Sequence, residues 1–229
     1  MGDGGEGKPH YAGHRERLRE RFLKSPGALP DYELLELILF RAVPRRDVKP
    51  LAKELIARFG GFSEVINAEP ARLRETKGVS DAILTEFHIV RETGLRLTQA
   101  KVLKKEVIGS WDALIEYCSA SMAHNPTEQF RILFLDRKNV LIADEVQQKG
   151  TVDHTPVYPR EVVKRALELN ASALILVHNH PSGRTEPSAE DRAITQKLQT
   201  ASAAVSIKIL DHIIIGDNRY FSFREKELL

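Results

Sequence analysis

Two histidines and an aspartate lie close together in the last third of the sequence. His178 and His180 are separated by one residue, and Asp191 follows eleven residues after His180, within the stretch HNHPSGRTEPSAED. Two imidazoles and a carboxylate are the nitrogen and oxygen ligands that catalytic zinc sites use, with one coordination position left open. The residue types therefore predict a metal site formed by His178, His180 and Asp191.

The segments around these residues predict how the three side chains meet. Residues 173–177 (ALILV) are apolar and rich in β-forming side chains, which predicts a buried strand ending at the histidines. Side chains of a strand alternate between its faces, so the two imidazoles lie on one side, about 6.6 Å apart along the strand. Residues 181–183 (PSG) end the strand, and a helix expected from Ser188 carries the aspartate in its first turn.

Each part of this pattern also has a structural explanation. A His-x-His pair at the end of a strand is often only polar surface, and Ser188 with Asp191 has the spacing of a helix capping box. The combination of two histidines on one face, a chain break and an aspartate on a helix favours metal binding. Ser188 can cap the helix while Asp191 faces the metal.

Hydrolysis at such a centre also needs a base that takes a proton from the attacking water. The residues themselves leave several carboxylates open as candidates, because spacing does not choose among them. These candidates are Glu128, Glu145, Asp153, Glu161 and Asp211.

The composition predicts a protein of the reducing cytoplasm. The single cysteine, Cys118, excludes an internal disulfide framework, and its place in a helical stretch favours a buried structural thiol over a nucleophile. The chain opens without a signal-peptide pattern, and no apolar run approaches the 18 residues of a membrane span. We therefore expect a cytoplasmic protein without a membrane partner.

The pattern of elements changes near residue 105 and predicts two domains. Residues 1–105 read as helices with short connections, ending in the charged connector 101–105 (KVLKK), and Asp31 is a possible N-cap of the second helix. Residues 106–229 alternate strands and helices, which predicts an α/β or α+β domain. The expected helices cover residues 14–22, 31–40, 49–59, 62–66, 72–74, 81–97, 111–121, 160–169 and 188–201, and the expected strands cover 130–135, 140–146, 173–177, 207–215 and 220–223.

The two halves differ in charge. Residues 1–105 have 20 Lys and Arg against 15 Asp and Glu, whereas the remainder has 14 against 17. A basic module attached to an acidic one is compatible with a domain that contacts a polyanion. For the basic stretch 14–22 (HRERLRERF), an ordinary solvated helix face is the other explanation.

The metal-binding stretch resembles a known motif. HNHPSGRTEPSAED matches the His-x-His-x(7)-Ser-x(2)-Asp pattern of the JAB/MPN-type (JAMM) metalloproteases at all four fixed positions, and Glu128 lies where that family has its catalytic glutamate. The segments FRILFLDRKNVLI, VYPREVVKRALELNASALILVHNHPSG and DHIIIGD resemble the bacterial RadC-like branch, historically called DNA repair proteins. The resemblance covers nearly the whole chain.

This resemblance implies a fold, a metal and roles for single residues. It implies a JAB/MPN-type domain with a central mixed sheet flanked by helices, in which His178, His180 and Asp191 hold one Zn²⁺ and water takes the fourth place. Glu128 would be the general base, and Ser188 would help to stabilise the oxyanion at the attacked carbonyl. Arg184 and Glu186 change the charge of the loop between the ligands, and this loop is expected to sense the substrate, so the resemblance leaves the specificity open.

The front domain resembles the helical N-terminal region of RadC proteins, which has helix-hairpin-helix character. The turn of that motif favours Gly-hydrophobic-Gly, whereas this chain has Gly78-Val79-Ser80. Lys77, with Arg72 and Arg74 nearby, has the charge to contact DNA phosphates without reading sequence. A protein-docking or regulatory helical bundle is an equally good interpretation.

The sequence thus predicts a zinc-dependent metallohydrolase that cleaves an amide, peptide or isopeptide bond in a protein or peptide substrate. The alternative is a DNA-binding or DNA-processing factor in repair or recombination, recruited to DNA by its N-terminal domain. His212 is expected to be a structural histidine rather than a fourth ligand, and His154 is a candidate for lining the cleft. The sequence determines neither the substrate nor the oligomeric state.

Overall fold

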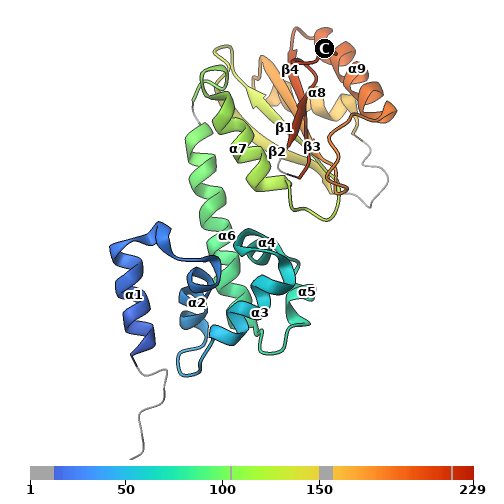
Figure 1. The fold of residues 1–229 in the computed structure, drawn as a ribbon. Helices are drawn as coiled ribbons and strands as arrows, with labels where there is room; N and C mark the ends of the chain where they lie inside the picture. Colours follow the sequence, from blue (N-terminus) through green and yellow to red (C-terminus); the bar gives the residue numbers. More distant parts are fainter. Residues whose placement is uncertain (1–12, 104, 150–156, 218) are drawn as a thin grey trace, which may run out of the picture. The chain divides into compact units, whose positions relative to one another are not determined.

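The computed structural model describes residues 13–103, 105–149, 157–217 and 219–229 (Figure 1). The chain divides into two compact units, Met1–Thr93 and Gly94–Leu229. The division lies inside helix α6 (Asp81–Val102). This helix continues past residue 97, where the sequence pattern predicted its end. The charged connector 101–105 therefore begins within the helix.

The first unit is helical, as the sequence predicted. A short 3₁₀ turn, Pro26–Ala28, joins its first two α-helices, and a buried apolar core holds the unit together. Gly60, with φ of 109°, ends the third helix in a conformation that favours glycine. The helices are α1 (His14–Lys24), α2 (Asp31–Ala42), α3 (Lys49–Phe59), α4 (Phe62–Asn67), α5 (Pro70–Arg74) and the first part of α6.

The expectation that Asp31 caps α2 was wrong. Asp31 is the first residue inside α2, and Pro30 occupies the N-cap position without a side-chain hydrogen bond. The Asp31 carboxylate instead accepts a hydrogen bond of 2.9 Å from the backbone N–H of Phe62, the first residue of α4. A free N–H at the start of one helix is thus satisfied by a side chain from another helix, which local sequence rules do not detect.

The basic helix α1 uses several of its cations to pack against α2. His14 Nε2 lies 2.7 Å from the buried Glu36 carboxylate, and Arg21 forms two hydrogen bonds with Glu33. Arg15 donates to backbone carbonyl oxygens that follow α2. These contacts give the basic stretch 14–22 a role inside the helical unit.

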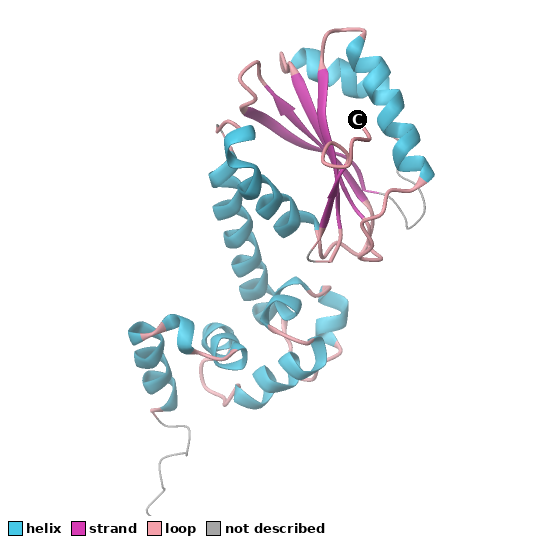
Figure 2. Ribbon diagram, turned by 45° about the horizontal axis from the view of Figure 1, so that its top comes forward, coloured by secondary structure: helices cyan, strands magenta, loops and turns pink. Residues whose placement is uncertain are grey.

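The second unit is a five-stranded mixed sheet with helices on both faces, as predicted (Figure 2). The strand order is β2-β1-β3-β4-β5; β3 and β4 are parallel, and the other neighbours are antiparallel. The elements are α7 (Trp111–Met122), β1 (Gln129–Leu135), β2 (Leu141–Lys149), α8 (Pro159–Glu168), β3 (Ala173–Asn179), α9 (Ala189–Ala203), β4 (Lys208–Ile215) and β5 (Tyr220–Ser222), with a 3₁₀ turn at Ile108–Ser110.

Alternation along the fully buried strand β3 separates two cores. Ile175 and Val177 belong to the core that includes α7, whereas Leu174 and Leu176 belong to the core that includes α8 and α9. His178 continues the second series and therefore points to the side of α9. The fold thus brings the end of β3 toward the beginning of α9. The helices in the described parts of the chain include none with the length and hydropathy of a membrane span.

Candidate metal centre

The structure brings His178, His180 and Asp191 together. His178 Nε2 lies 3.0 Å from His180 Nε2 and 3.1 Å from Asp191 Oδ1. His180 Nε2 lies 3.3 Å from Asp191 Oδ2. His178 is fully buried, Asp191 is 7% exposed and His180 is partly buried, so the three ligand atoms meet at the edge of the protein interior.

These separations fit a metal ion. A tetrahedral zinc ion with bonds of ~2.0–2.1 Å places its ligand atoms roughly 3.3 Å apart. The two ring nitrogens lie 3.0 Å apart, and each lies 3.1 or 3.3 Å from one oxygen of the Asp191 carboxylate, which is close to this value. The three residues could therefore hold a metal ion without a large rearrangement.

Backbone and side-chain contacts orient both imidazoles. The carbonyl oxygen of Arg184 lies 2.9 Å from His180 Nδ1. Since a carbonyl only accepts, His180 Nδ1 carries a proton, and Nε2 is the nitrogen of this ring that could bind a metal ion. His178 Nδ1 lies 2.8 Å from Nε2 of His212. The loop between the ligands thus contributes the backbone of Arg184, which side-chain patterns did not reveal.

Ser188 caps α9 and also holds the aspartate. Its Oγ accepts a hydrogen bond of 3.0 Å from the Asp191 N–H, and its own N–H donates to Asp191 Oδ2 at 2.8 Å. The Ser188 hydroxyl also donates to Asp191 Oδ2 at 2.7 Å. The predicted capping box is therefore confirmed. The role of Ser188 toward an oxyanion stays a prediction.

Asp191 and His180 shift each other's pKa. Although burial acts to raise the pKa of Asp191, its contacts with His178 and His180 outweigh burial and hold that pKa well below its usual range. The same contact with Asp191 raises the pKa of His180, against the effect of burial. Asp191 is therefore a carboxylate at any ordinary pH, as a metal ligand must be.

Glu128 is the predicted base whose charge acts on this centre. It is partly buried, directly precedes β1 and contributes to the raised pKa of His180. Three of the other candidate bases form hydrogen bonds with residues that are not candidate ligands. Glu145 binds Arg165, Glu161 binds Arg160, and the buried Asp211 accepts a hydrogen bond from Ser222. Asp153 lies outside the described residues, as does His154.

Asn179, the residue between the two histidines, holds the segment that carries Glu128. It points to the opposite face of β3 and is 1% exposed. Its Oδ1 accepts a hydrogen bond of 2.9 Å from the N–H of Gln129. Its Nδ2 donates to the carbonyl oxygens of Thr127 and Asn125, at 3.2 and 3.3 Å. Residues 178–180 thus supply two candidate ligands and, through Asn179, hold the backbone on either side of Glu128.

Asn179→Ala is expected to loosen this segment. The substitution leaves the buried N–H of Gln129 without its acceptor, and it should lower the free energy of unfolding by about 1–3 kcal/mol. Hydrogen exchange at Thr127 and Gln129 should become faster, as measured by mass spectrometry or NMR. Unchanged exchange at these positions would show that Asn179 does not hold them.

Cys118 lies in the core between α7 and the sheet. It is fully buried, and burial, assisted by the charge of Asp144, raises the pKa of its thiol to about 12. The interpretation as a structural thiol is consistent with this environment.

Iodoacetamide is therefore expected to leave Cys118 unmodified in the native protein. The raised pKa lowers the thiolate fraction roughly a thousandfold at neutral pH, and burial blocks access as well. Mass spectrometry should find labelling only after unfolding in urea. Labelling of the native chain at the rate of the unfolded chain would contradict this account.

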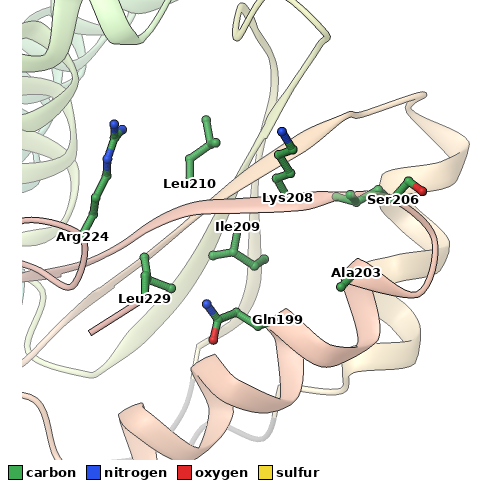
Figure 3. A pocket seen from close by; sticks show the side chains of 9 residues that line it. Gln199, Ala203, Ser206, Lys208, Ile209, Leu210, Arg224 and Leu229 are labelled. Carbon is green, nitrogen blue, oxygen red and sulfur yellow. The ribbon is translucent and has the colours of Figure 1, made fainter. Parts of the chain in front are cut away.

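A separate groove lies at the other end of the sheet. Its volume is about 710 Å³, and Figure 3 shows the Ile209 side chain of β4 on the side of Gln199 and Ala203 of α9, with Lys208 and Leu210 on the other side of the strand. None of the three candidate ligands lines it. The groove is therefore not part of the candidate metal centre.

In the helical unit, two of the three cations singled out for DNA contact have structural partners. Arg74 forms an ion pair of 2.9 Å with Asp81, and Arg72 lies over the ring of Phe59. Lys77 is exposed beside Gly78, whose φ of 102° requires the freedom of glycine. DNA binding by this unit stays a prediction, which salt-dependent binding of duplex DNA to the full chain would test.

Comparison with known proteins identifies the family of this chain. The RadC-like JAB domain family matches residues 108–228. A UPF0758 protein of Rhodobacter capsulatus is 60% identical over 213 residues, which cover 93% of this chain and 100% of the relative. A UPF0758 protein of Ruegeria pomeroyi is 57% identical over 217 residues, which cover 94% of this chain and 97% of the relative. The chain therefore belongs to the RadC family and has a RadC-like JAB domain.

Proposed function

We propose that the C-terminal unit is a zinc-dependent hydrolase that cleaves an amide bond in a protein or peptide, including an isopeptide bond. The convergence of His178, His180 and Asp191 at the distances of a tetrahedral site carries this proposal. Membership in the RadC-like JAB domain family supports it. A bound zinc ion lowers the pKa of a coordinated water to about 7 and polarises a carbonyl group.

In this proposal Glu128 is the general base. Its carboxylate takes a proton from the attacking water, whose oxygen forms a bond to the carbonyl carbon of the substrate. When the carbon–nitrogen bond breaks, Glu128 returns the proton to the leaving amine. Asn179 keeps the Glu128 segment in place during both transfers, because its hydrogen bonds fix the backbone on either side.

Ser188 has a second role in this proposal. Its hydroxyl, which donates to Asp191 in the structure, turns to the oxyanion that develops on the carbonyl oxygen of the substrate. The other two contacts of the capping box keep Asp191 in place meanwhile, since they use the backbone N–H groups of both residues.

A peptide library tests the proposal across many sequences at once, so no single substrate has to be chosen. Zinc-loaded protein is incubated with peptides from a bacterial proteome and with branched peptides that contain a lysine isopeptide bond. New amino termini or released lysine side chains are then detected by mass spectrometry. The proposal expects cleavage by the zinc-loaded protein that disappears after treatment with a chelator. Cleavage that is equally fast with and without the chelator would refute it.

A further inference from the structure

A chain of buried hydrogen bonds connects two of the candidate ligands through residues outside the motif. Thr195 Oγ1 lies 2.5 Å from the backbone carbonyl oxygen of Asp191 and 2.6 Å from His212 Nδ1. His212 Nε2 in turn lies 2.8 Å from His178 Nδ1. All four residues are buried. The chain begins at the backbone of one ligand and ends on the ring of another.

The direction of these hydrogen bonds follows from the chemistry of the groups. A carbonyl only accepts, so the single hydroxyl proton of Thr195 is donated to Asp191. Thr195 Oγ1 must then accept from His212, whose Nδ1 carries a proton. The ring of His212 is fully buried, and its two nitrogens contact a hydroxyl and an imidazole, neither of which balances a positive charge, so the ring is neutral. Its Nε2 therefore accepts a proton from His178 Nδ1.

We propose that Thr195 and His212 are positioning residues that fix His178 as the tautomer with a proton on Nδ1. This inference rests on the proposed metal site, because only that tautomer presents the electron pair of Nε2 to the ion. The register of the sheet supports it, since His212 of β4 lies directly beside Leu176 of β3, two residues before His178. His212, which the sequence predicted to be a structural histidine, thereby acquires a function.

Aromatic rings fix the orientation of the His178 and His212 imidazoles. Phe130 stacks on His178 with ring centres 5.9 Å apart, and Phe223 stacks on His212 at 4.7 Å. His212 is fully buried between these neighbours. Since the ring is shielded from water, Thr195 is the group that determines which of its nitrogens carries the proton.

Removal of the Thr195 hydroxyl should release this constraint. His212 then has no acceptor for its Nδ1 proton, and the tautomer with a proton on Nε2 becomes favourable. That proton would be donated to His178 Nδ1, which places the His178 proton on Nε2, where it competes with the metal. The metal affinity should therefore fall although all three ligands are present.

Three substitutions on α9 test this effect through zinc affinity, measured by competition with a chromogenic chelator. Thr195→Val keeps the shape of the side chain and should weaken zinc binding about 10- to 100-fold. Thr195→Ser restores the hydroxyl and should restore the affinity. Thr200→Val is the matched control, because Thr200 donates to a backbone carbonyl of the same helix but is exposed. It should bind zinc like the unmodified chain.

Nitrogen-15 NMR of the histidine rings in the zinc-free, unmodified chain gives a second readout. It should find His178 protonated at Nδ1 and His212 protonated at Nδ1. A His178 ring without a proton on Nδ1, or an unchanged zinc affinity of a folded Thr195→Val variant, would overturn the inference. If the unmodified chain bound no zinc, the proposed function would fail, whereas the tautomer measured by NMR would still decide this inference.

Discussion

Asp191→Ala is expected to reduce the zinc content of the purified protein from about one ion per chain to nearly none. Asp191 supplies the carboxylate of the proposed site and lies within 3.1 and 3.3 Å of the two ring nitrogens. Two histidines alone leave the ion without an anionic ligand and without a third fixed contact. Atomic emission spectrometry of protein loaded with zinc and then desalted measures the content.

The same substitution should also destabilise the C-terminal unit. Asp191 Oδ2 accepts from the N–H and the hydroxyl of Ser188, and the loss of this capping box costs about 1–2 kcal/mol of unfolding free energy. Asp191→Asn separates the two effects, since its amide oxygen can still accept from Ser188 but has no charge. Glu190→Ala is the control, because Glu190 lies in the same first turn and is exposed. A full zinc content in Asp191→Ala would remove Asp191 from the site.

Glu128→Gln is expected to keep the zinc ion and to lose hydrolysis. The substitution preserves the size of the side chain, and the hydrogen bonds of Asn179 to the Glu128 segment use backbone atoms that it does not alter. An amide cannot take a proton from water, so kcat should fall about 10²- to 10⁴-fold. The rate is measured on a peptide that the library experiment identifies, with zinc content determined in the same sample.

Glu161→Gln provides the comparison for this result. Glu161 was a candidate base from the sequence, but it is exposed and bonded to Arg160. Its substitution should leave both zinc content and rate unchanged. A Glu128→Gln variant that hydrolyses at the full rate would show that another group takes the proton.

The sequence predicted the parts of the site that depend on local periodicity. Alternation along a strand placed His178 and His180 on one side, and the spacing of Ser188 and Asp191 predicted the capping box. Both predictions depend on residues only a few positions apart, where backbone geometry alone determines the outcome.

Features that depend on packing between distant segments could not be predicted. The contact of His212 with His178 depends on the register of two parallel strands, and that of Thr195 with His212 depends on how α9 lies on the sheet. The hydrogen bond from Phe62 to Asp31 likewise joins two helices. Sequence spacing could not select Glu128 among five carboxylates, because partners such as Arg165 for Glu145 appear only after folding.

X-ray absorption spectroscopy of the zinc-loaded, unmodified chain tests the central claim most directly. The account predicts four nitrogen and oxygen ligands at ~2.0–2.2 Å, with the multiple scattering of two imidazoles. It predicts no sulfur ligand, because the one cysteine, Cys118, is buried in the core between α7 and the sheet. A zinc–sulfur distance near ~2.3 Å, a spectrum without imidazole scattering, or a chain that retains no zinc would contradict the account.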